Sequence, residues 1–308
     1  MHILFVTGEY PPLEGGVGAY TAELSHALAD QGARVSVLTS DTASAATPTG
    51  DVRVYPLMEK WGPSIWESVP RMAATLAADW IHVQYQTAAF GMNPAINVAP
   101  SYWRRANPHA AVAWTYHDVL APYLFPKAGA RLRNWVTLRP AASSDLVIAT
   151  NEGDHFALAP QAGARLAKIP IGSNITALAL SPSERQAART AWGYVDDDIV
   201  IGYFGFLNRS KGGTTLIRTL ARLREEHPSV KLLMIGERVG ASDPTNYAYL
   251  QEVEELIAEF DLGDRVQWTG RLADEAVAAA LNGCDLLFMP YEDGASLRRG
   301  TLMAGLAN

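Results

Sequence analysis

The sequence is poor in cysteine and has no long run of apolar residues. Its single cysteine, Cys284, rules out an internal disulfide framework and suits a reducing cytoplasm. No uninterrupted apolar run reaches the roughly 18 residues that a membrane span needs. The formal net charge of −7 argues against a general nucleic-acid-binding protein. Together these absences predict a soluble, cytoplasmic protein that has no membrane span and binds no nucleic acid.

Metal-binding patterns are also missing from the sequence. It contains no HExxH motif and no paired CxxC motifs. The acidic run Asp196-Asp197-Asp198 is better explained as a polar turn before a strand, because aspartate favours turns. We therefore expect no metal site.

What the first half of the chain does contain is an alternation of short apolar runs with helical patterns. One helical face carries apolar residues from Val17 to Leu28, and Gly32 follows as a C-terminal cap. Such alternation predicts a parallel sheet covered on both faces. The expected strands are His2–Thr7, Arg34–Thr39, Val52–Leu57, Trp80–Tyr85, Ala111–Tyr116 and Leu146–Thr150.

The pattern changes between Gly172 and Asp198, and 308 residues are comfortable for two domains. Ser181 is typical of a helix N-cap, with Pro182 at the first helical position. We expect one domain over residues 1–175 and a second over 176–308, the latter incomplete at its C-terminus. Its expected strands are Ile199–Leu207, Val230–Gly236, Arg265–Gly270 and Asp285–Tyr291, and its expected helices lie near Lys211–Glu226, Thr245–Phe260, Asp274–Leu281 and Leu297–Ala307.

A glycine-containing turn follows the first expected strand. Gly15 and Gly16 can adopt positive φ and would let an anion approach the backbone N–H groups of the next helix. A dinucleotide fold, with Asp41 near the ribose, is an alternative, but Thr21 stands where its third glycine belongs. The turn could also be a structural turn without a ligand.

A second glycine turn, Gly205–Gly213, follows the strand that opens the second domain. It contains Arg209 and Lys211 and no acidic residue, so an ammonium group and backbone N–H groups could converge on a diphosphate. A Walker motif is excluded because Lys211 precedes the glycines. The alternative is a pair of solvated cations.

A third segment, residues 292–301, follows the last expected strand at its carboxyl end, where open α/β sheets bind ligands. Gly294, Ala295 and Ser296 could present N–H groups before a helix. Arg298 and Arg299 would oppose the dipole of that helix, which indicates an anionic partner. They could also be ordinary surface arginines.

Taken together, these segments resemble the retaining GT-B glycosyltransferases, most closely family four, the glycosyl transferases group 1 type. The resemblance rests on four segments in the order that the family keeps them. They are Pro11-Pro12 with Gly15–Gly18, Thr115-Tyr116-His117-Asp118, Phe204–Gly212 and Tyr291–Leu302.

The resemblance implies two Rossmann-like domains, with the donor nucleotide in the second and most of the acceptor in the first. It implies retention of anomeric configuration, with no metal and no cofactor beyond the nucleotide-sugar substrate, which would be a UDP-, GDP- or ADP-sugar. The acceptor would be a saccharide, a lipid-linked molecule or a small molecule, so peripheral membrane association is possible.

The resemblance also implies roles for single residues. His117 and Glu292 would contact the donor sugar, and Lys211 would neutralise the diphosphate; these three are the expected catalytic residues. Glu14, Gly15 and Asp118 would bind the acceptor. The donor would be bound by Gly16, Arg209, Lys211, Gly294, Ala295, Ser296, Arg298, Arg299 and Thr301.

The sequence departs from the family pattern at two places. Phe206 stands where the family often has an arginine, directly after the glycine at position 205, and Arg209 is a possible substitute for that arginine. The second glutamate of the acidic loop is replaced by Gly300, or by Thr301 if one residue is inserted. A non-catalytic nucleotide-sugar-binding paralogue therefore stays an alternative, as does, less favourably, an NAD-type oxidoreductase. His117 could likewise be a buried histidine bonded to the backbone.

Overall fold

The chain forms two compact units in a computed structural model, Met1–Ile171 and Gly172–Asn308. The structure describes residues 1–308 except 14, 44–51, 123–125, 240–244 and 298. Each unit is a parallel α/β layer structure, which confirms the predicted fold class.

The first unit is built on a seven-stranded parallel sheet with the order β3-β2-β1-β4-β5-β6-β7. The order reverses between β1 and β4, so the carboxyl ends of β1, β4 and β5 lie next to each other. Its strands are β1 (His2–Thr7), β2 (Arg34–Ser40), β3 (Val52–Met58), β4 (Trp80–Tyr85), β5 (Ala111–Tyr116), β6 (Leu146–Ala149) and β7 (Leu166–Lys168).

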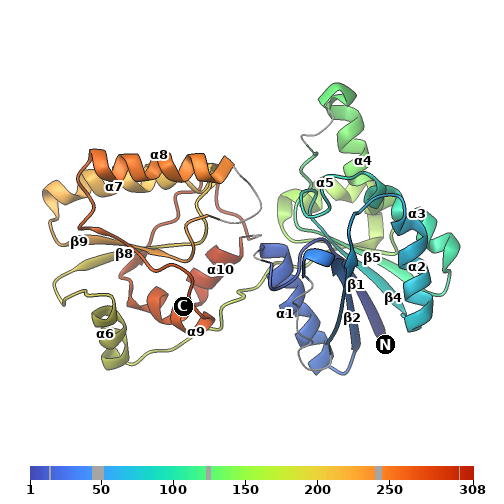
Figure 1. The fold of residues 1–308 in the computed structure, drawn as a ribbon, viewed down its shortest axis with the longest axis horizontal. Helices are drawn as coiled ribbons and strands as arrows, with labels where there is room; N and C mark the ends of the chain where they lie inside the picture. The colour runs from blue at the N-terminus through green and yellow to red at the C-terminus, as the bar shows by residue number, and fades with distance from the viewer. Residues whose placement is uncertain (14, 44–51, 123–125, 240–244, 298) are drawn as a thin grey trace. The chain divides into compact units, whose positions relative to one another are not determined.

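Helices cover both faces of this sheet (Figure 1). Leu4 and Val6 point to a core shared with α2, α3, α4 and α5, whereas Ile3 and Phe5 point to a core shared with α1. Side chains alternate between faces along a strand, so a strand that is apolar throughout must be covered on both sides. The helices are α1 (Gly16–Asp30), α2 (Ile65–Leu76), α3 (Ala95–Ala106), α4 (Gly129–Ser143) and α5 (Glu152–Ala162).

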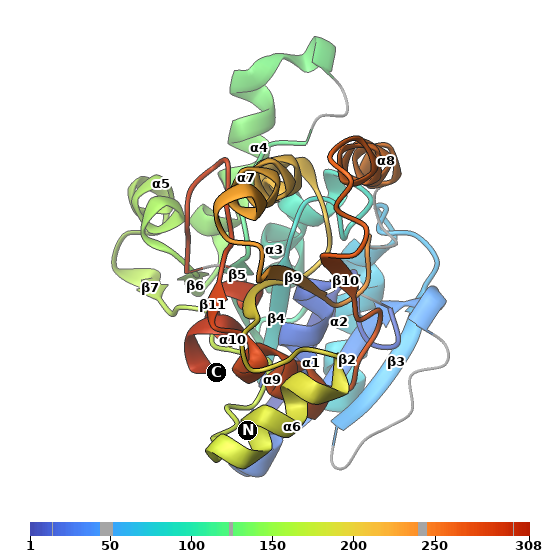
Figure 2. The ribbon, with the colours of Figure 1, turned by 90° about the vertical axis from the view of Figure 1, so that its left-hand side faces the viewer.

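The second unit has a four-stranded parallel sheet with the order β10-β9-β8-β11. Helices α7 and α8 pack on one face, and α9 and α10 on the other (Figures 1 and 2). The strands are β8 (Ile199–Phe204), β9 (Val230–Ile235), β10 (Val266–Trp268) and β11 (Leu286–Leu287); the helices are α6 (Pro182–Ala191), α7 (Gly213–Glu226), α8 (Thr245–Glu259), α9 (Asp274–Gly283) and α10 (Gly300–Ala307).

The predicted cap of α6 is confirmed as a capping box. Ser181 Oγ accepts a hydrogen bond from the Glu184 amide, and the Glu184 carboxylate accepts one from the Ser181 amide. Farther along the helix, Arg189 is buried and donates to Asp285 Oδ2, which also accepts from the Val200 amide. The helix that opens the second unit is thereby attached to β8 and to the residue before β11.

Several expected boundaries were wrong, and the differences lie around the candidate site. β11 pairs with β8 through only Leu286 and Leu287, and Pro290 farther on has no N–H to continue the ladder. Helix α10 begins at Gly300 instead of Leu297, so residues 292–297 and Arg299 lie before the helix. Helix α7 begins at Gly213, which places Lys211 in the short 3₁₀ turn η4 (Arg209–Lys211). The strand β7 was not predicted.

Candidate functional site

The first glycine turn connects β1 to α1 in the first unit. Its glycines do not need positive φ, contrary to the expectation: Gly15 has φ −169° and Gly16 is helical. A Cβ at Gly15 would lie 2.1 Å from the Glu9 carboxylate, so a larger residue there would displace the end of that side chain. At Gly16 a Cβ would meet nothing within 4 Å. The N-cap residue of α1 is Gly15, which has no side chain to cap the helix, so the first N–H groups of α1 can face an anion.

His117 follows β5 at the same edge of the sheet. Its ring packs edge-to-face on Tyr20 of α1 with centroids 4.9 Å apart, so the structure brings His117 and the first helical turns of α1 together. Its Nε2–H donates to Gln84 Oε1 at 2.9 Å, and its backbone N–H donates to Tyr85 O. The histidine is therefore buried and bonded to a side chain as well as to the backbone.

Burial lowers the pKa of His117 to about 3, with a further contribution from His82. Burial likewise lowers the pKa of His82 to about 4. Both rings are neutral near pH 7, so His117 is suited to hydrogen bonding with a neutral ligand group and poorly suited to proton transfer.

The other two predicted residues of this unit differ in their outcome. Asp118 is buried, and its Oδ1 accepts a hydrogen bond from the Leu120 amide, which shapes the loop after His117. Glu14 lies outside the described residues.

The second unit brings the second and third predicted segments into contact. A Cβ at Gly212, where φ is +69°, would lie 2.0 Å from Pro290 O, so only glycine permits this approach. The Glu292 amide donates to Ser210 O at 2.9 Å. The loop after β8 and the loop after β11 thus meet at the carboxyl edge of the sheet.

Lys211 lies in this junction. A Cβ on Gly205 would be 3.0 Å from Lys211 Nζ and 2.8 Å from the Thr301 methyl group, which brings these three residues together. No described residue accepts a hydrogen bond from Lys211 Nζ, which lies 6.0 Å from the centre of the Phe206 ring. Burial, and secondarily the Arg299 guanidinium, lower the pKa of Lys211 to about 8.

Arg299 is the second cation of this cluster. Its guanidinium lies 4.1 Å from the centre of the Tyr291 ring and donates to Asp293. Its Nε is buried, and within the described part of the chain it has no hydrogen-bond partner. Tyr291 in turn shares a hydrogen bond with Thr301 at 3.3 Å. The cluster therefore combines two cations with two hydroxyl groups and one acid.

Arg209 does not join this cluster. Its side chain, 70% exposed, donates to Glu252 on α8 at 2.9 Å and lies over the Tyr249 ring. The side chain of Asn208 accepts a hydrogen bond from the Lys211 amide and so caps the 3₁₀ turn η4. Arg209 and Lys211 lie at the two ends of this turn, and their side chains point in different directions.

The remaining predicted residues of the third segment form its exposed part. Glu292, Gly294 and Ala295 are exposed and Ser296 is partly buried, and the N–H groups of residues 294–296 do not belong to the first turn of α10. Arg298 lies outside the described residues.

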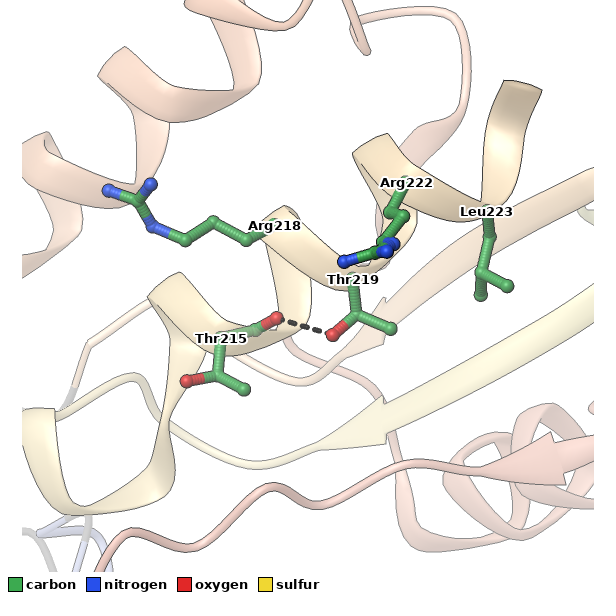
Figure 3. Close-up of a pocket in the computed structure, with 5 residues that line it drawn as sticks. All are labelled: Thr215, Arg218, Thr219, Arg222 and Leu223. Atoms are coloured by element: carbon green, nitrogen blue, oxygen red, sulfur yellow. Dashed lines mark hydrogen bonds between the residues drawn. The ribbon is translucent and has the colours of Figure 1, made fainter. Parts of the chain in front are cut away.

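A separate hollow of about 340 Å³ lies along α7 (Figure 3). It is lined by one face of the helix, and Thr219 donates its hydroxyl hydrogen to Thr215 O within it. None of the predicted site residues lines it, and we assign it no role. Its lining residues are Thr215, Arg218, Thr219, Arg222 and Leu223.

Neither a metal-binding cluster nor a membrane-spanning helix is found among the described residues. Among the described residues, no three His, Cys, Asp or Glu side chains lie close enough to share a metal ion. The described helices include none with the length and apolar character of a membrane span.

Sequence reasoning missed several residues of these clusters. Gln84 and His82 are polar residues at alternate positions of the otherwise apolar β4, a signal that places both on one face. Tyr291 and Glu9 gave no such signal, because their contacts depend on where distant loops meet.

Both halves of the chain match known family models. Residues 14–176 match the model for Glycosyltransferase Family 4, more than half of the chain. Residues 184–296 match that for Glycosyl transferases group 1. The chain belongs to glycosyltransferase family 4. The resemblance inferred from the motifs is thereby confirmed.

Two curated relatives give the scale of the likeness. EpsD of Bacillus subtilis is 30% identical to this chain over 175 residues, which cover 50% of this chain and 42% of EpsD. The D-inositol 3-phosphate glycosyltransferase of Stackebrandtia nassauensis is 24% identical over 302 residues, 90% of this chain and 66% of the relative. This chain thus spans less than two thirds of the length of each of these two relatives.

Solved structures extend the likeness to the fold, which confirms the GT-B class. Sucrose-phosphate synthase from Thermosynechococcus elongatus matches with a TM-score of 0.71 at 21% identity. The match covers 94% of this chain and 75% of the synthase chain. Anabaena HepE in complex with UDP-glucose matches with a TM-score of 0.66 at 20% identity, covering 94% and 74%.

Proposed function

We propose that this protein is a retaining, metal-independent glycosyltransferase that moves a hexosyl group from a nucleoside-diphosphate sugar to an acceptor hydroxyl. The observation that carries the proposal is Lys211, a largely buried ammonium group with no described hydrogen-bond acceptor and with Arg299 as a neighbouring cation. Two cations at the carboxyl ends of β8 and β11 form a site suited to a diphosphate.

The chemistry explains why these cations would matter. When the bond between the anomeric carbon and the diphosphate breaks, negative charge develops on the leaving phosphate oxygen. A group already positioned to stabilise such charge lowers the barrier by about 3 kcal/mol. Lys211 supplies a charge and Arg299 supplies planar N–H donors, which would perform the role that a divalent metal has in other phosphate sites.

The other predicted residues take supporting roles in this proposal. Thr301 lies beside Lys211 and would bind a phosphate oxygen or the ribose. The backbone N–H groups of Gly294, Ala295 and Ser296 would contact the donor, as would Gly16 at the start of α1. His117 and Glu292 would contact the transferred sugar, and Gly15 and Asp118 the acceptor. Arg209, which is paired with Glu252, would contribute less than Lys211.

Donor turnover tests the proposal directly. We expect one of UDP-glucose, GDP-mannose and ADP-glucose to raise the unfolding temperature and to be turned over, because a ligand stabilises the state it binds. HepE was crystallised with UDP-glucose, which makes that donor the first to try. Absence of binding and turnover with all three donors would contradict the proposed donor class.

Two further measurements test the finer parts of the proposal. Turnover should survive EDTA, because Lys211 and Arg299 provide the charge at the diphosphate. The anomeric configuration of the product, followed by NMR, should equal that of the donor. Loss of activity with EDTA that Mg²⁺ restores would refute metal independence, and an inverted product would refute retention.

The acceptor is the open part of the proposal. The relatives named D-inositol 3-phosphate glycosyltransferase make an inositol phosphate one acceptor to test. The structure offers a reason to test lipid-linked acceptors too. The N-terminal half of α4 projects from the first unit (Figure 1), with Leu132 51% and Trp135 55% exposed.

Charge supports a lipid surface as the partner of this helix. Residues 119–144 contain four basic residues and no Asp or Glu, although the whole chain has a net charge of −7. Each lysine or arginine near an anionic bilayer contributes about 1 kcal/mol of attraction. The basic residues are Lys127, Arg131, Arg133 and Arg139.

Vesicle sedimentation tests the lipid surface. The protein should co-sediment with vesicles of phosphatidylglycerol and phosphatidylcholine but not with phosphatidylcholine alone. The double variant Leu132→Ser with Trp135→Ser should lose this binding. Phe156→Ser is the matched control, because Phe156 is 82% exposed on the neighbouring helix α5. Equal loss in both variants, or equal binding to both vesicles, would refute the role of α4.

One observation favours a second candidate function. Gly300 stands where the resemblance places the second glutamate, so a non-catalytic protein that binds a nucleotide sugar is the alternative. Binding of UDP-glucose without hydrolysis or transfer to any acceptor would favour it. The dinucleotide alternative has less support, since Thr21 lies inside α1 and bonds Val17 O.

A further inference from the structure

A buried polar chain connects β4 to His117 in the first unit. His82 and Gln84 point to the same side of β4, and His117 follows the neighbouring strand β5. Thr115 Oγ1 lies 2.8 Å from His82 Nε2, Gln84 Nε2 lies 3.4 Å from the same His82 nitrogen, and Gln84 Oε1 lies 2.9 Å from His117 Nε2. All four side chains are buried.

The chemistry of each atom determines where the protons lie. A carbonyl oxygen can only accept, so Gln84 Oε1 requires the hydrogen of His117 to be on Nε2. The Gln84 amide group and the Thr115 hydroxyl can both donate to His82 Nε2, an arrangement in which His82 carries its hydrogen on Nδ1.

We propose that Gln84 is a positioning residue that holds His117 in the Nε2–H tautomer and leaves Nδ1 as the nitrogen that accepts a hydrogen bond from the donor sugar. No described residue bonds Nδ1, so that nitrogen is available to a ligand. The sugar position that meets His117 must then carry a hydroxyl group, because an unprotonated nitrogen binds only donors.

Burial explains why a positioning residue is needed at this place. Burial keeps both histidines neutral, as their lowered pKa values indicate. A neutral imidazole exists in two tautomers, and its hydrogen-bond partners set the balance between them. Without Gln84, the ring would present an acceptor and a donor in mixed populations to the same sugar hydroxyl.

The first experiment needs no ligand. In protein labelled with ¹⁵N-histidine, long-range ¹H–¹⁵N correlations distinguish Nε2 from Nδ1, and His117→Asn identifies the His117 signals. We expect His117 to carry its hydrogen on Nε2 in the unchanged protein. Gln84→Met, which removes the acceptor at similar volume, should give averaged nitrogen shifts. A hydrogen on Nδ1, or unchanged shifts in Gln84→Met, would overturn the proposal.

Two other variants make the result specific. Gln84→Glu keeps an oxygen facing His117 but removes the donor to His82, so the Nε2–H of His117 should remain. It also provides the test if Gln84→Met does not fold. Ser36→Ala is the matched control, because Ser36 Oγ bonds His2 Nε2 at 3.0 Å in the same sheet. It should alter the His2 signals and leave His117 unchanged; a change at His117 would show that the effect is not specific to Gln84.

Turnover completes the test and rests on the proposed function. With UDP-glucose as the donor, Gln84→Met should lower kcat about tenfold, the effect of losing one oriented hydrogen bond, while Ser36→Ala should not. A normal kcat in Gln84→Met with averaged His117 shifts would overturn the functional half of the proposal. If the unchanged protein turns over none of the three donors, the donor assignment fails while the NMR result still decides the tautomer.

Discussion

His117 in the first unit and Lys211 in the second are both nitrogen bases that follow a parallel strand and have a pKa lowered by burial. They differ in their partners. His117 donates to Gln84, whereas no described residue accepts from Lys211. The comparison separates two uses of burial: the neutral, bonded imidazole is kept in one orientation, and the unbonded ammonium holds unfavourable free energy that an anion would relieve.

The largest expected effect is the loss of donor turnover when the Lys211 ammonium group is removed. Lys211→Ala should lower donor turnover by up to roughly 10³-fold, because it removes a charge positioned at the leaving phosphate. The measurement is kcat/KM with the donor that the binding panel identifies. Arg209→Ala is the matched control and should stay within about threefold, because an exposed ion pair contributes little. Equal losses in the two variants would contradict the separation of these cations.

The next effect concerns the two buried histidines. The pKa values of His82 (about 4) and His117 (about 3) lie below the ordinary histidine value of 6.5, so between pH 3 and pH 6.5 the unfolded chain binds more protons than the folded chain. Stability is therefore full above pH 6.5 and is lost as pH falls toward 3. We expect the free energy of unfolding to drop by about 4 kcal/mol between pH 7 and pH 5.

Urea unfolding at the two pH values measures this drop. His82→Gln is the variant that sharpens it, since glutamine keeps a hydrogen-bonding group and does not titrate. It should remove about half of the pH dependence. A pH dependence of stability that is identical in this variant would mean that His82 is not held neutral by the fold.

For Lys211, burial destabilises the charged form of the group, so removing the charge should stabilise the fold. Its folded pKa of about 8 lies below 10.5, so the charged form destabilises the fold below pH 8, and stability recovers as pH rises from 8 toward 10.5. Lys211→Met should raise the free energy of unfolding by about 2 kcal/mol at pH 7. Thermal or urea unfolding tests this; a less stable variant would indicate that the ammonium group has a favourable partner.

Ligand affinity should follow the titration of the same group. A bound diphosphate favours the ammonium form, so the affinity for UDP should be greatest below pH 8 and fall by about tenfold at pH 9. Calorimetric titration at pH 7 and pH 9 measures the difference. In Lys211→Arg the guanidinium stays charged at both values, and the affinity should be independent of pH.

The smallest effect compares two adjacent glycines. Gly15→Ala places a Cβ 2.1 Å from the Glu9 carboxylate, which must move, and should cost about 1 kcal/mol of stability. Gly16→Ala meets nothing within 4 Å and should leave stability within about 0.5 kcal/mol. Its expected effect is on donor binding, where the methyl group would hinder a phosphate. Equal stability losses would show that the turn constrains both positions alike.

The fold could be predicted from the sequence because its strands are continuous apolar runs. Leu4 and Val6 on one side and Ile3 and Phe5 on the other all need cover, which only a sheet between two helix layers provides. The edge strand Leu166–Lys168 was missed because three partly exposed residues carry no periodic signal. The last strand was overestimated because Phe288–Pro290 is apolar like a strand but forms the start of the loop.

The candidate site was predictable only in part. Loops after strands could be named, since ligands gather at the carboxyl ends of parallel strands. The sequence could not show which side chains of these loops point into the site. The direction of Arg209, for example, depends on the turn capped by Asn208 and on the ion pair with Glu252, and the second of these contacts depends on tertiary structure. The bond between Gln84 and His117 joins two strands and likewise has no local signature.

The contact between Gly212 and Pro290 has a consequence for protein engineering. Because a side chain at Gly212 has no room and the Glu292 amide is bonded to Ser210, the two loops can be exchanged only as one module. A chimaera that takes the loop after β8 from a relative but keeps the native loop after β11 would join two surfaces that did not evolve together. Donor preference should therefore transfer between relatives only when both loops travel as a pair.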